Sequence, residues 1–183
     1  GFEAKLVSHA EELKGYDHVI LPGVGSFRVC MENLKKTGFD NSLKEYAQSG
    51  KPLMGICLGM QILAGKGYED GESDGLNIVP GKVERFDAVD PNIKIPHVGW
   101  NDVAFKFGPS ALGKSIKHSD TFYFTHSFQF ECDDPSHSIG ETFYVKPFTS
   151  AILKDNVFAT QFHPEKSQET GLKLFKNFIN WKP

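Results

Sequence analysis

Residues 51–61, KPLMGICLGMQ, constrain the fold more than any other part of the chain. An apolar run meets Gly55-Ile56-Cys57-Leu58-Gly59 and continues directly into helix-forming residues. This is the layout of a nucleophile elbow, in which a strand ends, one residue is held in a strained turn and a helix begins. Glycines on both sides of Cys57 remove side chains that would collide in so sharp a bend. The segment predicts a strand, a sharp turn at Cys57 and a helix over residues 58–64.

The position of Cys57 also predicts chemistry. A sulfur at a helix N-terminus lies beside free N–H groups and the positive end of the helix dipole, both of which favour the thiolate. We therefore expect an activated nucleophile. The alternative is a buried cysteine that packs as a small apolar residue.

Composition indicates one ordinary globular domain, residues 1–183. The chain is 39% hydrophobic and 23% charged, with a net charge of −3 and scattered Lys and Arg residues. That distribution argues against nucleic acid or an anionic membrane as a partner. No apolar stretch approaches the roughly 20 residues that cross a bilayer. Cysteines at positions 30, 57 and 132 suggest no disulfide framework, so we expect a cytoplasmic protein. The histidines lack metal-ligand spacing, and we expect no metal or other cofactor.

The order of apolar segments predicts an α/β fold with a largely parallel sheet and added antiparallel strands. Ser26 is a candidate N-cap for the first helix and Asp40 for the second. The last helix should turn Leu172, Phe175 and Phe178 or Ile179 inward. Expected strands cover residues 3–7, 17–21, 82–86, 100–107, 121–124, 128–132, 151–154 and 157–162, and expected helices residues 26–36, 40–48 and 169–179.

A cysteine nucleophile needs a base and a group that orients the base, and Gln161-Phe162-His163-Pro164-Glu165 supplies both at a strand end. Residues i and i+2 of a strand share a side, so Glu165 could bond His163 directly, or local turns could bring it there. Alone, each residue has a structural or solvated reading. Together they favour a Cys-His-Glu triad.

Three segments resemble the signatures of class I glutamine amidotransferases: residues 22–25 (PGVG), 55–61 (GICLGMQ) and 162–167 (FHPEKS). Residues 96–101 (PHVGWN) and 123–128 (YFTHSF) most resemble the glutaminase subunits of imidazole glycerol phosphate synthases. The resemblance implies a flavodoxin-like three-layer fold. It also implies hydrolysis of L-glutamine to glutamate and ammonia through a glutamyl thioester on Cys57, with His163 and Glu165 as its partners.

The resemblance further implies roles in binding. The backbone N–H groups of Leu58 and Val24 would stabilise the oxyanion. Four residues within the matching motifs would bind glutamine: Gly23, Gln61, Ser127 and Phe128.

Trp100, Tyr123 and Lys166 match positions at the family's docking face for a synthase (cyclase) subunit, so we expect a heterodimer. The synthase would use the ammonia to form imidazole glycerol phosphate and AICAR in histidine biosynthesis. One alternative is a related synthase that aminates a nucleotide sugar for surface polysaccharides. Another is a non-catalytic binding scaffold. For Trp100 and Tyr123, packing in the core is an equal alternative to an interface.

The related glutaminases begin with a further strand and helix, which this sequence lacks before Gly1-Phe2-Glu3. We therefore expect an N-terminally truncated chain whose first βα unit is missing.

Overall fold

A computed structural model describes residues 2–87, 93–108 and 110–183. Two parallel pairings form the centre of its sheet: β1 (Val19–Gly23) with β2 (Leu53–Cys57), and β2 with β11 (Val157–Thr160). Five further strands continue the sheet beyond β11, in the order β10 (Pro147–Lys154), β8 (Phe128–Cys132), β5 (Gly81–Arg85), β3 (Lys66–Gly67) and β4 (Ser73–Asp74). Residues of β2 are buried along its whole length, as in a strand covered on both faces. The predicted α/β class is confirmed.

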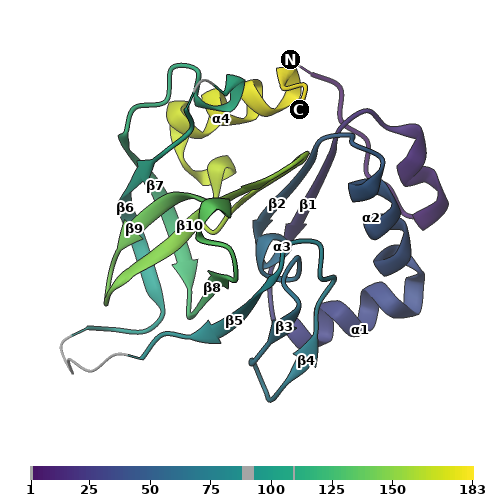
Figure 1. Ribbon diagram of the computed structural model, residues 1–183, viewed down its shortest axis with the longest axis horizontal. Coiled ribbons are helices and arrows are strands. Elements are labelled where there is room, and N and C mark those ends of the chain that lie inside the picture. Colours follow the sequence, from purple (N-terminus) through teal and green to yellow (C-terminus); the bar gives the residue numbers. More distant parts are fainter. Residues whose placement is uncertain (1, 88–92, 109) are drawn as a thin grey trace.

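Antiparallel strands extend this parallel centre. They are β5 (Gly81–Arg85), β6 (His97–Phe105), β7 (Ser119–His126), β8 (Phe128–Cys132), β9 (Ser138–Phe143) and β10 (Pro147–Lys154), with the two-residue strands β3 (Lys66–Gly67) and β4 (Ser73–Asp74) at one edge. β3 runs parallel to β5, whereas β6, β7 and β9 form a branch attached through β10. Figure 1 shows this branch as a curled wall opposite β1 and β2. Strand β9 and the two short strands were not predicted.

Two hydrophobic cores lie on the two faces of the sheet, because successive side chains of a strand point to opposite faces. Leu53 of β2 belongs to the core beneath the first two helices, and Met54 to the core beneath the last one. Helices α1 (Phe27–Thr37) and α2 (Phe39–Gln48) lie beside β1 and β2, and α4 (Gln168–Asn180) lies over the other core (Figure 1). This is the predicted three-layer arrangement.

Short 3-10 turns complete the chain: Ala10–Gly15, Ala111–Gly113, Pro135–His137 and Pro164–Lys166. The elbow helix α3 spans only Leu58–Gln61, because the following N–H groups form tighter i→i−3 bonds such as Leu63 N–H to the Met60 carbonyl. No helix among the described residues is long and apolar enough to cross a membrane.

Three local predictions were wrong, and that of Ser26 was right in position only. Residues 3–7 form no strand, and Leu6 is 90% exposed. Ser26 occupies the N-cap position without a side-chain bond. Asp40 caps nothing because left-handed Gly38 (φ 76°) ends α1 and starts α2 directly. Leu172 is 67% exposed because another face of α4 meets the core.

A glycine decides which face of α4 turns inward. A Cβ at Gly171 would overlap the Pro164 carbonyl, so the helix can approach that turn only on its Gly171 side. Leu174 and Phe178 share this face and are fully buried.

Candidate active site

Cys57 occupies the strained turn that the sequence predicted. Its backbone has φ 54° and ψ −111°, between the end of β2 and the start of α3. A Cβ at Gly55 would lie 2.8 Å from the Gly59 carbonyl oxygen, and one at Gly59 would overlap the Leu21 carbonyl. Gly55 is therefore required for α3 to fold back against β2, and Gly59 for the elbow to pack against β1. Such strain persists only where surrounding packing over-determines the backbone.

The histidine partner is fixed from three sides. His163 follows β11, is 3% exposed, and donates its backbone N–H to the Tyr123 carbonyl at 2.9 Å. Its Nδ1 lies 2.6 Å from Glu165 Oε1. The Ser167 hydroxyl donates to the His163 carbonyl at 2.6 Å and accepts from the Tyr123 N–H at 3.0 Å. The turn Pro164–Lys166 brings the carboxylate to the ring, which decides between the two routes left open by the sequence.

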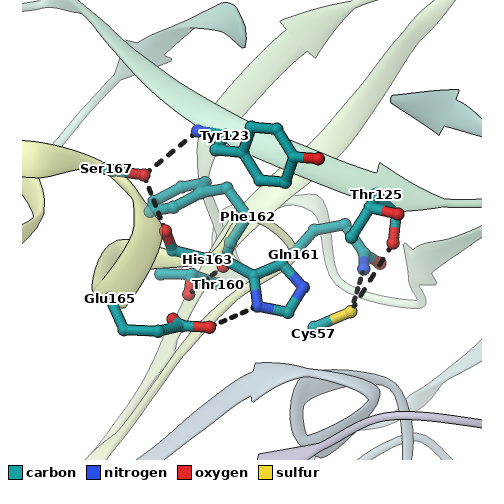
Figure 2. A network of polar contacts seen from close by, with 9 residues as sticks. All are labelled: Cys57, Tyr123, Thr125, Thr160, Gln161, Phe162, His163, Glu165 and Ser167. Atoms are coloured by element: carbon teal, nitrogen blue, oxygen red, sulfur yellow. Dashed lines mark hydrogen bonds and ion pairs between the residues drawn. The ribbon is translucent and has the colours of Figure 1, made fainter. Parts of the chain in front are cut away.

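Because a carboxylate only accepts, His163 Nδ1 carries the proton and Nε2 is left as an acceptor. Nε2 is buried and has no hydrogen-bond partner among the described residues. Figure 2 shows this side of the ring turned toward the Cys57 sulfur. The arrangement can accept a proton from the thiol.

The thiol is protonated at rest, contrary to the expected thiolate. Burial, with a smaller contribution from the Glu165 charge, raises the pKa of Cys57 to about 11. The Leu58 N–H, Lys166 and Gln161 lower the pKa by less. Gln161 Nε2 lies 3.7 Å from the sulfur, and the sulfur lies 4.0 Å from the Thr125 carbonyl oxygen. The nucleophile must therefore lose its proton to His163 during attack.

A cleft of ≈ 370 Å³ opens over the sulfur. Eight of the predicted site residues line it: Val24, Cys57, Leu58, Gln61, Ser127, Phe128, His163 and Lys166. Glu69 and Thr125 also line it and were not predicted from the sequence. The described part of the chain has no group of three or more His, Cys, Asp or Glu side chains that could hold a metal ion.

Gly23 lies behind the cleft rather than in its wall. It pairs with Cys57 across β1 and β2, and a Cβ there would stand 3.0 Å from Leu58 Cβ and from the Gly59 nitrogen. The geometry assigns Gly23 to close packing of the elbow. Val24 beyond it is 82% exposed at the mouth of the cleft.

Gln61 is held by two bonds from one amide nitrogen. Its Nε2 donates to the Phe128 carbonyl at 3.2 Å and to Gln161 Oε1 at 2.9 Å. Both amide hydrogens are thus used, so Gln61 can offer a ligand only its Oε1 acceptor. Gln161 was missed because its partners lie about a hundred positions away along the chain.

Glu69 closes the opposite side of the cleft. Its Oε2 accepts the Phe27 N–H at 2.7 Å, so it caps α1 in place of Ser26, whose buried hydroxyl has no partner. A carboxylate at a helix N-terminus is favourable. Glu69 therefore anchors the end of the loop that carries Val24.

The three predicted interface residues, Trp100, Tyr123 and Lys166, lie together beside the cleft. With Val98, which is exposed and was not predicted, they form a surface that we call the aromatic patch. Trp100 is 50% exposed and makes an edge contact with Tyr123 at 6.0 Å. Lys166 Nζ lies 5.7 Å from the centre of the Tyr123 ring. Because Lys166 also lines the cleft, the patch and the cleft are continuous.

The family profile described as "Glutamine amidotransferase class-I" matches residues 2–181. The sequence is 43% identical to "Imidazole glycerol phosphate synthase subunit HisH" of Sulfurimonas denitrificans, covering 100% of this chain and 88% of that protein. It is 44% identical to the HisH subunit of Chlorobaculum tepidum, covering 99% and 89%. A solved structure titled "Structure of PurLQS from Thermotoga maritima" matches with a TM-score of 0.73 and 21% identity, covering 98% of this chain and 86% of that one.

Proposed function

The chain belongs to the class I glutamine amidotransferases, and from that premise we propose how it works as the glutaminase subunit of an imidazole glycerol phosphate synthase. One observation carries the proposal. The Cys57 sulfur, on a strained elbow, faces the unpaired Nε2 of a histidine whose Nδ1 is bonded to Glu165 at 2.6 Å. A non-catalytic scaffold would have no need for this arrangement.

The first half-reaction forms a thioester. His163 Nε2 takes the thiol proton as the Cys57 sulfur attacks the side-chain amide carbon of glutamine. The resulting oxyanion is stabilised by the Leu58 N–H and, in our proposal, by the Val24 N–H. The imidazolium, held by Glu165, then returns its proton to the amide nitrogen, and ammonia leaves.

The second half-reaction releases glutamate. A water molecule gives a proton to His163 and attacks the thioester carbon. The collapse of the tetrahedral intermediate expels the cysteine sulfur, which takes the proton back from His163. The same imidazole thus acts as acid and as base in turn. Because Cys57 loses its proton only during attack, the resting thiol is a weaker nucleophile toward other electrophiles than a thiolate would be.

Charge in the cleft suits the α-groups of glutamine. The α-ammonium finds the Glu69 carboxylate and the only free polar atom of Gln61, its Oε1 acceptor. The backbone at Ser127 and Phe128 lies on the same wall and would receive the α-carboxylate. Glu69 then binds the substrate while it anchors the Val24 loop.

Ammonia would leave toward the aromatic patch, where we propose that the cyclase subunit docks to make a heterodimer. Exposed Trp and Tyr side chains are typical interface anchors. Lys166 borders both the cleft and the patch, so a partner on the patch would cover the outlet. Enclosure matters because ammonium, unlike ammonia, is not nucleophilic.

Glutamate release from glutamine tests the proposal, measured with and without a candidate cyclase subunit. The wild-type chain with the cyclase should produce glutamate and form imidazole glycerol phosphate, and Cys57→Ala should abolish glutamate release. Full activity in Cys57→Ala would refute the nucleophile. Glutamate release that couples only to a nucleotide-sugar synthase would refute the partner and keep the chemistry.

A further inference from the structure

Two buried histidines lie next to the catalytic groups without taking part in the proposed chemistry. His97 is the first residue of β6 and His126 the last of β7, and they pair across the two antiparallel strands. They are 3% and 6% exposed. His97 Nδ1 lies 3.0 Å from His126 Nε2.

The hydrogen bonds of the two rings fix which nitrogen donates and which accepts at each contact. His126 Nδ1 lies 2.7 Å from the Phe128 carbonyl, which can only accept, so Nδ1 carries the proton. In the neutral ring Nε2 then accepts from His97 Nδ1, and His97 Nε2 accepts from Asn101 Nδ2 at 3.3 Å. Asn101 Nδ2 also donates to the Phe143 carbonyl at 2.9 Å, and its Oδ1 accepts the Asp102 N–H at 2.9 Å. Reversing the amide would lose both bonds.

The rings are held in place by their aromatic neighbours. The His97 ring stacks on Tyr144 at 4.0 Å and on Phe124 at 4.7 Å. Burial lowers the pKa of His97 to about 4 and that of His126 to about 3. Both rings are therefore neutral near neutral pH, as the bonding pattern requires.

The chain of bonds ends at the glutamine-binding wall. The Phe128 carbonyl that accepts from His126 also accepts from Gln61 Nε2. Gln61 bonds Gln161, and Gln161 Nε2 contacts the Cys57 sulfur. The relay so defined runs from Asn101 through His97, His126 and the Phe128 carbonyl to Gln61. Its far end, on β6, alternates with Val98 and Trp100 of the aromatic patch.

We propose that His97 and His126 are positioning residues, which hold the Phe128 carbonyl and, through it, Gln61 in the place where Gln61 binds glutamine. They also connect that wall to the strand that carries the aromatic patch. This rests on the proposed glutaminase function. The relay touches neither the scissile amide nor the triad's own hydrogen bonds. Its loss should therefore weaken glutamine binding more than it slows the chemical steps.

The test compares two variants of nearly equal shape. Asn at position 97 keeps a donor near the place of Nδ1, whereas Leu keeps the volume and has no donor. With the cyclase subunit present, we expect His97→Leu to raise the KM for glutamine roughly tenfold, the value of one lost hydrogen bond, with kcat changed by less than about threefold. His97→Asn should stay within about threefold of the wild-type KM.

Tyr144→Phe is the matched control, because it keeps the ring stacked on His97 and removes only a hydroxyl that donates to the Lys94 carbonyl. Its KM should equal that of the wild type. If His97→Leu does not fold, Asn101→Leu replaces it. A leucine keeps the volume and cannot donate to His97 Nε2, so it should raise KM in the same way.

Equal KM values for His97→Leu and His97→Asn would overturn the relay. A kcat that falls by as large a factor as KM rises would also overturn it. The same holds for an Asn101→Leu variant with the wild-type KM. A wild-type chain that hydrolyses no glutamine with the cyclase would instead refute the proposed function, and the relay with it. If the wild-type chain is active and His97→Leu and His97→Asn have the same KM, the relay alone is refuted.

Discussion

Acid should destabilise this protein through its two buried neutral histidines, and His97→Asn should remove half of that effect. Burial lowers the pKa of His97 to about 4 and that of His126 to about 3, from an ordinary 6.5. A base with a lowered folded pKa contributes stability that is present above its unfolded pKa and lost as pH falls. The loss therefore begins near pH 6.5 and continues toward the folded values.

The size of the effect follows from the unfolded state alone. Between about pH 7.5 and about pH 5.5 an unfolded histidine becomes protonated, whereas a buried one stays neutral, which costs about 1.4 kcal/mol. The pair should therefore contribute about 2.8 kcal/mol to the loss in unfolding free energy over that interval, and His97→Asn should reduce this contribution to about 1.4 kcal/mol.

Urea unfolding at several pH values, followed by tryptophan fluorescence, measures this difference directly. Tyr144→Phe is the control, since it changes a residue of the same stack and leaves both histidines in place. Its pH slope should match that of the wild-type chain. A His97→Asn variant with the wild-type slope would refute the argument, because it would mean that His97 takes up protons equally in the folded and unfolded states.

Three further outcomes are expected. Gly59→Ala should lower the unfolding free energy by at least about 3 kcal/mol, because its Cβ would overlap the Leu21 carbonyl. Gly15→Ala has open space around its Cβ and should change the unfolding free energy by less than about 0.5 kcal/mol, and urea titrations compare the two variants. The rate of iodoacetamide labelling at Cys57 should rise about tenfold per pH unit toward pH 11, since burial raises the pKa of this thiol. Peptide mass spectrometry measures the labelling rate, and a plateau below about pH 9 would contradict the raised pKa. Glu165→Gln should lower kcat for glutamine hydrolysis by at least about 10², with little change in KM, and an unchanged kcat in the glutamate-release assay would remove Glu165 from the triad.

Predictions that depend on neighbours in the chain succeeded. The elbow at Cys57 follows from a few consecutive residues, and the structure has the strand, the positive φ and the helix in that order. The segment of residues 161–165 predicted a histidine and a carboxylate in contact, and they lie 2.6 Å apart. A short turn creates that contact, so a local sequence pattern was sufficient to predict it.

Predictions that depend on distant partners failed or were absent. Residues 3–7 have an apolar and polar alternation, but a strand forms only where a neighbouring strand accepts its hydrogen bonds. Leu172 belongs to an apolar stripe, yet the close approach of Gly171 to Pro164 turns Leu172 outward. Glu69 caps a helix that begins 42 positions earlier, and no local pattern marks such a pairing.

By itself the sequence determined the elbow at Cys57, the contact between His163 and Glu165, and the α/β class, because each depends on strand, turn and helix preferences over a few residues. Only the tertiary structure decided the protonation of Cys57, since burial by the whole fold outweighs the short helix behind it. The same holds for the relay from Asn101 to Gln61, because two of its links join residues that are 29 and 67 positions apart in the chain. Local preferences are encoded in neighbouring residues, whereas burial and long-range hydrogen bonds exist only once the sheet has assembled.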